Sequence, residues 1–326
     1  MRLVFPLAAL LFTAGPALAA RQSDVTPDSG TPAAAPAPAP ALRFAWPAPS
    51  RVTVTERTLK KGKRAVMRYD AVLTARKEGG HELKLDKFHF LERDGHDLTK
   101  GPLSPEIKEA TALASAIPTL VLSAEGQLVD MAGVEEMLER IYKMMPEDQR
   151  EQMRAMFERP EMKEALKQKG GEFWTAWVGT WVGLELAAGE ESSGTMQTQL
   201  PSGPVDTVVT VRHRGPDAEH KGAVRLELES VLEGEPFRKA MVASIAQMLQ
   251  AATPQDKEQP DVDAMVKSAR RVSSAEVVMD AASMRPFSAR RSEVSKLVVG
   301  DKESETIEEH EYSFVWPAQK KAGKRR

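Results

Sequence analysis

The sequence predicts an α+β protein in which curved antiparallel β-sheet packs on a helical block, as a single large domain or as two fused sheet-helix halves. Apolar and polar residues alternate in two separate regions, near 52–91 and 205–316. Between and within these regions the apolar spacing changes to that of a helix. Hydrophobic residues make up 41% of the 326 residues, which is enough for a substantial core.

The first sheet region is predicted to hold a three-stranded meander and a separate hairpin. Alternation, turn residues and β-branched residues place these strands at 52–59, 65–75, 82–91, 117–122 and 128–131. The apolar face of the third strand changes phase after Leu85. This change predicts a β-bulge near Asp86 and Lys87.

Helical spacing dominates residues 132–186, which we predict to form a mainly helical segment interrupted at Gly170 and Gly171. The second sheet region follows, with alternation that begins at Val205. A further helix is predicted at 236–250, opened by Pro236 at a first-turn position. A polar loop over 253–260 then leads to the final predicted strands, at 275–281, 287–299 and 306–316.

The residues at the two ends of the chain predict where in the cell the protein is located. Residues 1–19 have the basic start, short apolar run and Ala-x-Ala ending of a secretory signal peptide. Residues 20–41 are rich in Pro and Ala and are expected to be a disordered linker before a folded domain at 42–317. Residues 318–326 form a basic tail, either a solvated terminus or a weak contact with an anionic surface. We therefore expect a periplasmic or secreted protein without a transmembrane segment.

The composition excludes several chemistries. The chain has no cysteine, which excludes disulfides, thiolate nucleophiles, cysteine-ligated metals and a lipoprotein anchor. It lacks the motifs of common secreted hydrolases and of phosphate or calcium sites. The spacing of His81, His89 and His96 defines no ligand geometry, and we expect them to be solvated loop residues. We therefore expect no enzyme activity, catalytic residue, metal or cofactor.

The folded body is acidic, which argues against nucleic acid as a partner. The net charge of the whole chain is −2, and without Arg2 and the five basic tail residues it becomes −8. Phosphate binding requires a broad electropositive face, which such a body lacks.

One titratable group lies on a predicted inward face. His310 alternates with Tyr312, and we expect a core histidine bonded to a carboxylate or carbonyl. The adjacent Glu308 and Glu309 point to opposite faces of a strand, so they form no ready acid–base pair, and we expect ordinary surface charge there.

Seven of the fifteen methionines lie between Met131 and Met162. They could form a pliable surface that adapts to a hydrophobic ligand or partner, bind Cu(I), or pack helices on a sheet. Small inward residues such as Ala65 and Ala71 leave room beside the sheet, and a ligand site needs roughly 300 Å³ or more. The candidate walls of such an apolar ligand site are Met137, Ile141, Phe173, Trp174 and Trp177.

The segments at 44–48 and 314–318 share an aromatic-x-Trp-Pro-Ala pattern. The repetition is either a coincidence, since aromatic residues are common in strands and prolines at their ends, or a sign of proximity. In the second case the first and last strands lie close together, close the sheet and make the body one domain.

The strand–Asp–turn–Pro segment at 277–287, the hairpin at 120–130 and the terminal strand around 312–314 together resemble periplasmic lipoprotein-carrier and related lipoprotein families. The resemblance covers under a fifth of the chain. It implies a curved antiparallel sheet that wraps around helices, and it transfers no functional residue. The long helical segment and the Pro-Ala leader depart from the family pattern.

These observations predict a non-enzymatic protein that binds an apolar ligand, lipid-like or lipoprotein-like, between sheet and helices. The alternative is a structural or assembly protein of the cell envelope that acts through contacts with a protein partner.

Overall fold

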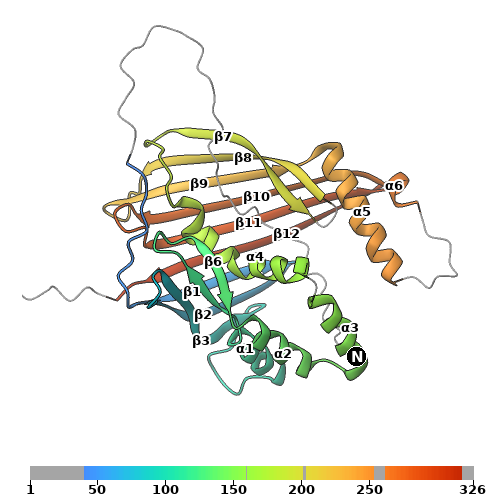
Figure 1. Ribbon diagram of the computed structural model, residues 1–326, viewed down its shortest axis with the longest axis horizontal. Helices are drawn as coiled ribbons and strands as arrows, with labels where there is room; N and C mark the ends of the chain where they lie inside the picture. The colour runs from blue at the N-terminus through green and yellow to red at the C-terminus, as the bar shows by residue number, and fades with distance from the viewer. Residues whose placement is uncertain (1–39, 159, 201–202, 253–260, 318–326) are drawn as a thin grey trace, which may run out of the picture.

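The structure is a computed structural model that describes residues 40–158, 160–200, 203–252 and 261–317 (Figure 1). The predicted signal peptide, polar loop and basic tail, and all but the last two residues of the predicted linker, lie outside these ranges. The strands are β1 (Ser50–Lys60), β2 (Lys63–Ala75), β3 (His81–Arg93), β4 (His96–Asp97), β5 (Thr119–Leu122), β6 (Leu128–Ala132), β7 (Glu191–Leu200), β8 (Gly203–Pro216), β9 (Ala223–Leu232), β10 (Val266–Asp280), β11 (Pro286–Val299) and β12 (Lys302–Val315). The helices are α1 (Pro105–Ala114), α2 (Val134–Met144), α3 (Glu147–Phe157), α4 (Pro160–Trp177), the 3₁₀ helix η2 (Gly179–Trp181), α5 (Gly234–Ala252) and α6 (Val262–Met265).

The twelve strands of the described chain form one antiparallel sheet in the order β6-β5-β3-β2-β1-β12-β11-β10-β9-β8-β7, with β4 paired beside β3. More of the described residues lie in strands than in helices, so the α+β prediction holds in outline but the sheet dominates. The sheet is open, with β6 and β7 at its two edges. A single continuous sheet therefore joins the two regions that the sequence separates.

The first and last long strands lie side by side, as one interpretation of the repeated aromatic pattern predicts. β1 pairs with β12, with Val54 opposite Phe314, and the rings of Trp46 and Trp316 meet edge to face at 4.8 Å. The predicted consequence is wrong in one respect. The pairing lies in the middle of the sheet and joins its halves, while the edges stay open.

Local sequence signals explain several strand details. The predicted bulge is confirmed, because the β2–β3 register shifts beside Asp86, and Lys87 adopts a positive φ of 55°. The predicted hairpin appears as β5 and β6, closed by the turn at 123–127. The edge strand β7 escaped prediction because its Ser, Gly and Thr residues give no alternating apolar pattern.

The helices α2, α3 and α4 and η2 fall within 132–186. The predicted interruption at Gly170 and Gly171 is wrong, since α4 runs through both residues without a break. A side chain at Gly170 would overlap Met131, and one at Gly171 would overlap Leu128, both from β6. The two glycines therefore permit close packing of α4 on β6 and do not end the helix.

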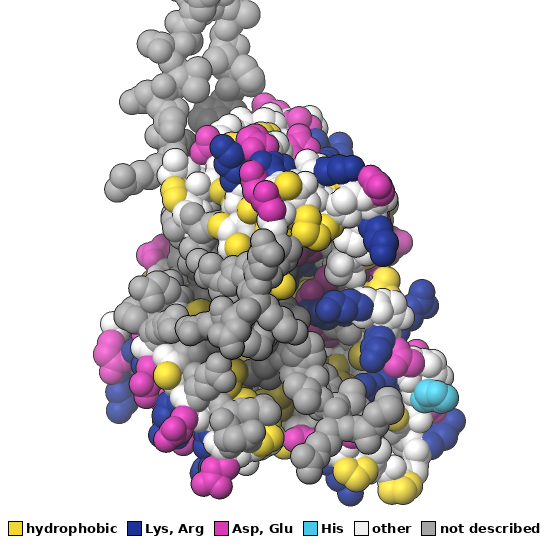
Figure 2. Space-filling view, turned by 90° about the vertical axis from the view of Figure 1, so that its right-hand side faces the viewer, with side chains coloured by type: hydrophobic (Ala, Val, Ile, Leu, Met, Phe, Trp, Pro, Cys, Tyr) yellow, Lys and Arg dark blue, Asp and Glu magenta, His cyan; other side chains and the backbone are white. Residues whose placement is uncertain are grey.

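Both long helices, α4 and α5, pack on the same face of the sheet, which we call the inner face (Figure 1). The main core lies where the aromatic residues of α4 and η2 meet the middle of the sheet. A second apolar cluster holds α5 against the other end of β7, β8, β9 and β10, through Leu200, Val205, Leu232, Phe237, Ala240 and Ala269. Viewed from the α5 side, the surface carries lysine and arginine beside acidic side chains around its rim (Figure 2).

None of the helices in the described ranges combines the length and apolarity needed to cross a membrane.

Candidate functional site

The structure separates the five predicted wall residues into two groups. Trp174 and Trp177 are 0% exposed in the main core, and the ring of Phe173 lies 4.8 Å from that of Trp177. Met137 and Ile141 lie instead in a small cluster where α2, α3 and α4 cross. The five residues therefore do not line one surface.

The tryptophans hold α4 in place. The Trp174 indole donates a hydrogen bond to the Gly126 carbonyl at 2.9 Å and packs against Phe44. The Trp177 ring meets Tyr312 and Phe314 edge to face, at 5.3 and 4.9 Å. Aromatic contacts of this geometry stabilise a core beyond the area that they bury.

Two hollows lie away from the sheet–helix interface. The first, of about 60 Å³, is at the crossing of α2, α3 and α4, and Glu135, Tyr142 and Arg154 are among its lining residues. The second, of about 330 Å³, is lined mainly by residues of the opposite, outer face of the sheet, with Ser274 and Ser292 on its floor between charged side chains. Neither hollow is the predicted cavity between sheet and helices.

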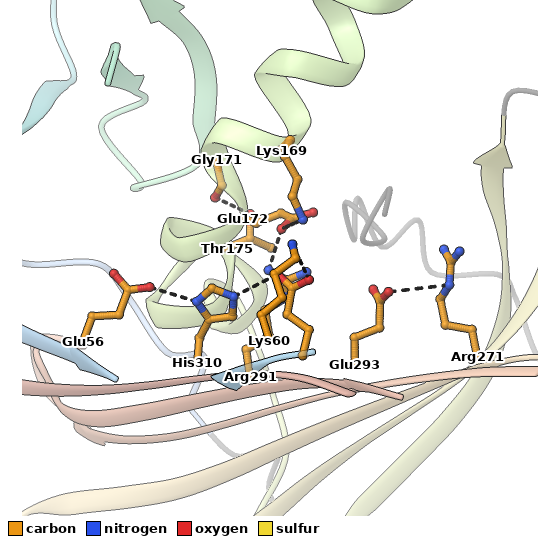
Figure 3. Close-up of polar contacts among 11 residues, drawn as sticks. Glu56, Lys60, Lys169, Gly171, Glu172, Thr175, Arg271, Arg291, Glu293 and His310 are labelled. Carbon is orange, nitrogen blue, oxygen red and sulfur yellow. Dashed lines mark hydrogen bonds and ion pairs between the residues drawn. The ribbon is translucent and has the colours of Figure 1, made fainter. Parts of the chain in front are cut away.

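A band of paired charges crosses the inner face of the sheet (Figure 3). It extends from His310, beside Tyr312 of the main core, to Arg271, which contacts α5. Alternate residues of a strand share a face, so residues two apart on β1, β10, β11 and β12 point inward together. Residues from α4 complete the band from above. We call this set the polar belt: Glu56, Lys60, Lys169, Glu172, Arg271, Arg291, Glu293, Glu308 and His310.

His310 lies between two carboxylates. Its Nδ1 is 2.8 Å from Oε1 of Glu56, and its Nε2 is 3.1 Å from Oε1 of Glu308. Burial alone would lower the pKa of His310, but the hydrogen bonds to Glu308 and Glu56 outweigh burial and raise this pKa. An imidazole with a carboxylate at each nitrogen must donate from both, so His310 is held as the cation.

The titratable side chains around His310 are held in charge states that complement its positive charge. Burial opposes the ionisation of Glu308, but hydrogen bonds from His310 and from Lys60, at 2.7 Å, hold the pKa of Glu308 well below its usual range. The Tyr69 hydroxyl donates to Oε2 of Glu56 at 3.1 Å. Burial and the Glu56 charge raise the pKa of both Tyr69 and Tyr312 well above the usual value, so both phenols stay protonated.

Glu172 links α4 to the sheet. Its Oε2 accepts from Arg291 at 2.5 Å and from Lys169 at 2.8 Å. Burial would lower the pKa of Arg291, yet the Glu172 charge raises it. Farther along the same face, Nε of Arg271 lies 3.8 Å from Oε1 of Glu293. The guanidinium carbon of Arg271 lies over the Phe237 ring of α5, 5.5 Å from the ring centroid. The belt therefore contacts both helices.

The pairing of residues across neighbouring strands shows that the inner face is charged at one end and uncharged at the other. One row of residues, each directly opposite the next, runs across the inner face from β7 to β1, and we call it the inner row: Gly194, Val209, Ser230, Ser273, Glu293, Glu308 and Lys60. Its members on β7 to β10 are apolar or small. Its members on β11, β12 and β1 are charged.

The adjacent row repeats this division. It runs through Val211, Leu228, Ala275, Arg291 and His310. We call the uncharged half of the inner row the apolar half, although two of its four members, Ser230 and Ser273, carry hydroxyl groups. It spans four strands, or three inter-strand spacings, which is about 14 Å.

Sequence reasoning found part of this arrangement. The expected core histidine bonded to a carboxylate is confirmed for His310, and Glu308 and Glu309 do point to opposite faces. The interpretation of Glu308 as ordinary surface charge is wrong, because it bonds His310 and Lys60 on the inner face. Arg291, although it lies at an inward position of a predicted strand, was missed because an arginine in an alternating pattern is usually assigned to the surface.

The prediction that His81, His89 and His96 are loop residues is wrong, because His81 and His89 lie on β3 and His96 lies on β4. The His81 ring packs against Phe44 at 5.5 Å, while His89 and His96 are exposed. Within the described residues, no group of three or more His, Asp or Glu side chains is arranged to hold a metal ion.

The raised pKa of His310 predicts a pH-dependent stability. A group with a raised folded-state pKa stabilises the fold below its unfolded pKa, and this contribution is lost as the pH rises through the folded value. We expect His310→Gln to cost about 2 kcal/mol at pH 5.5, where two charge-assisted hydrogen bonds are lost, and less at pH 9.5. Urea unfolding of both proteins at the two pH values measures this difference. A cost that grows with pH would contradict the assignment.

The comparisons with known proteins assign no family. No family model and no curated protein matches the chain. A solved structure of lipovitellin, described for its lipid–protein interactions, aligns with a TM-score of 0.41 and 10% identity over 82% of this chain; the chain spans 25% of the length of that protein. A porin-like protein from Bacteroides uniformis aligns with a TM-score of 0.17 and 6% identity, covering 84% of this chain and all of that one. Both likenesses are too slight to carry an argument, and neither supports the resemblance to lipoprotein carriers.

Proposed function

We propose that this protein is a non-catalytic binding protein that holds an amphiphile along the inner row between α4 and α5. The apolar chain of the ligand lies over β7 to β10, and its polar head lies toward β11, β12 and β1. The signal-like start of the sequence supports a place outside the cytoplasm, in the periplasm or secreted, which we include in the proposal.

The observation that carries this proposal is the division of one sheet face into an apolar and a charged half. In the first half Val209 is a buried member of the main core, Ser230 is buried, Ser273 is half-buried and Gly194 is exposed, while Glu293 and Glu308 begin the second half. A lipid-like molecule is divided in the same way. The apolar half is about 14 Å long, which suits an acyl chain of about twelve carbons.

Helix α5 supplies an adaptable wall for the chain. Met241 is half-buried and packs against the second apolar cluster, and Val242 and Ile245 on the same helix are half-buried too. Small floor residues, Ser230, Ser273 and Ala275, leave more space above the sheet than large ones would. Flexible and small side chains of this kind accommodate ligands of variable shape.

The state of His310 supports the non-catalytic part of the proposal. A general base must be unprotonated and must reach the proton that it removes. Both ring nitrogens of His310 are bonded to carboxylates, and the pKa of this histidine is raised, so it is held as a cation with no free lone pair. The other charged side chains of the polar belt are likewise paired with opposite charges.

Photo-crosslinking tests the location of the ligand. The purified protein is illuminated with dodecanol that carries a diazirine at mid-chain, and crosslinked peptides are identified by mass spectrometry. We expect labelling of the inner-face segments 205–211, 226–232 and 271–275.

Excess unlabelled dodecanol should suppress this labelling. The proposed function is wrong if no residue is labelled. It is also wrong if the label is found only on outer-face residues such as Val208 and Ile307, which are exposed apolar side chains.

A further inference from the structure

We propose that the ligand presents an uncharged hydrogen-bond donor, a hydroxyl group, to Glu172. This inference rests on the proposed function, since it specifies the head group of the same amphiphile. It excludes fatty acids and alkylamines as the preferred ligands.

The carboxylate of Glu172 has one unused oxygen. Its Oε2 accepts from Arg291 and Lys169, while Oε1 is buried and has no hydrogen-bond partner among the described residues. The side chain is only 10% exposed. A buried carboxylate oxygen without a donor is costly, so this atom is a place where a donor is missing.

The nearest hydroxyl does not fill this place. Thr175, one turn along α4, donates from Oγ1 to the carbonyl of Gly171 at 3.2 Å. Figure 3 shows Glu172 hanging from α4 above the sheet, beside Lys60 and Arg291 and on the same side as Glu293. A head group that follows the inner row toward its charged half therefore arrives below Glu172.

The charges of the belt exclude a charged head. It holds four basic groups, Lys60, Lys169, Arg271 and Arg291, and four carboxylates, Glu56, Glu172, Glu293 and Glu308, besides the His310 cation. An anionic head cannot donate a hydrogen bond to Oε1, and the negative charge of Glu172 would repel it. An ammonium head would lie beside Arg291 and Lys169, whose charges already neutralise Glu172. A neutral donor satisfies Oε1 without either conflict.

A head-group series tests this inference on the wild-type protein. Four twelve-carbon probes compete with the fluorescent probe 1-N-phenylnaphthylamine: 1-dodecanol, methyl dodecanoate, dodecanoate and dodecylamine. We expect dodecanol to bind about tenfold more tightly than methyl dodecanoate, which accepts but cannot donate. Dodecanoate and dodecylamine should bind no better than the ester.

In wild type the ligand must donate a hydrogen bond to residue 172. In the variant Glu172→Gln it must accept one, because an amide nitrogen can replace the unused oxygen and offer a donor. We expect this variant to lose the preference for dodecanol and to favour methyl dodecanoate. Glu309→Gln, on the outer face of β12, is the matched control and should keep the wild-type order. Circular dichroism shows whether each variant folds, and the wild-type series decides the question if Glu172→Gln does not.

The outcomes separate this inference from the proposed function. If none of the four probes binds, both are wrong. If all four bind within twofold of one another, or if a charged probe binds most tightly, the site is kept and the assignment of Glu172 to a hydroxyl head is overturned.

Discussion

Replacing Arg291 with methionine is expected to destabilise the fold by about 3–5 kcal/mol, because it leaves the buried Glu172 carboxylate without its strongest partner. The Arg291 and Glu172 side chains are 14% and 10% exposed, and their contact joins α4 to β11. Desolvated charges of this kind cost far more when one partner is removed than the pair contributes as a whole. Urea unfolding with linear extrapolation measures the loss.

A double-mutant cycle identifies the cause. Glu172→Met alone should cost a similar amount, and the double variant Arg291→Met with Glu172→Met should recover much of the loss because two apolar side chains replace the pair. Arg290→Met is the matched control: it is the adjacent residue, faces outward, is 52% exposed, and pairs with Glu309. Its expected cost is below about 1 kcal/mol. Additive losses in the double variant would show that the pair does not couple α4 to the sheet.

Much of the sheet could be predicted because most of the strands carry a local signal. Period-two alternation located β2, β8 and β9, and turn residues placed the hairpin of β5 and β6. The signal fails where a strand is polar on both faces, as in β7. The prediction for the two glycines of α4 was also wrong. Gly170 and Gly171 allow α4 to pack closely on β6, and this long-range contact is not encoded in the local sequence.

The candidate site was less predictable than the fold for a physical reason. Alternation shows which residues share a face but not which of two polar residues points inward, and charged residues are assigned outward by default. Glu308 and Glu309 illustrate this, since only the pairing of β12 with β1 and β11 places Glu308 beside Lys60 and Glu293. Long-range pairing of this kind is absent from a local pattern.

The tryptophans show the opposite difficulty. Their size and spacing marked Trp174 and Trp177 as important, and both lie at the centre of the main core. Whether a large apolar side chain lines a ligand site or fills a core depends on what covers it. The coverage here comes from the N-terminal segment around Phe44 and from Tyr312 and Phe314, which are distant in sequence.

Filling the inner row with one large side chain is expected to abolish amphiphile binding. Ser273 stands on β10 between Ser230 and Glu293, where the apolar half of the inner row meets the charged half. A tryptophan there would occupy the space that the ligand chain needs. Its neighbour Ser274 faces the opposite way and lines the 330 Å³ hollow of the outer face, so a tryptophan at 274 has room and leaves the inner row unchanged.

The comparison of Ser273→Trp with Ser274→Trp decides whether a ligand lies on this face of the sheet. Both variants are titrated with 1-dodecanol by displacement of 1-N-phenylnaphthylamine, after unfolding curves confirm that each is folded. We expect affinity to fall at least fiftyfold for Ser273→Trp and to stay within twofold of wild type for Ser274→Trp, where fiftyfold corresponds to about 2.3 kcal/mol. Equal affinities in the two folded variants, or a loss confined to Ser274→Trp, would contradict an amphiphile site on the inner face.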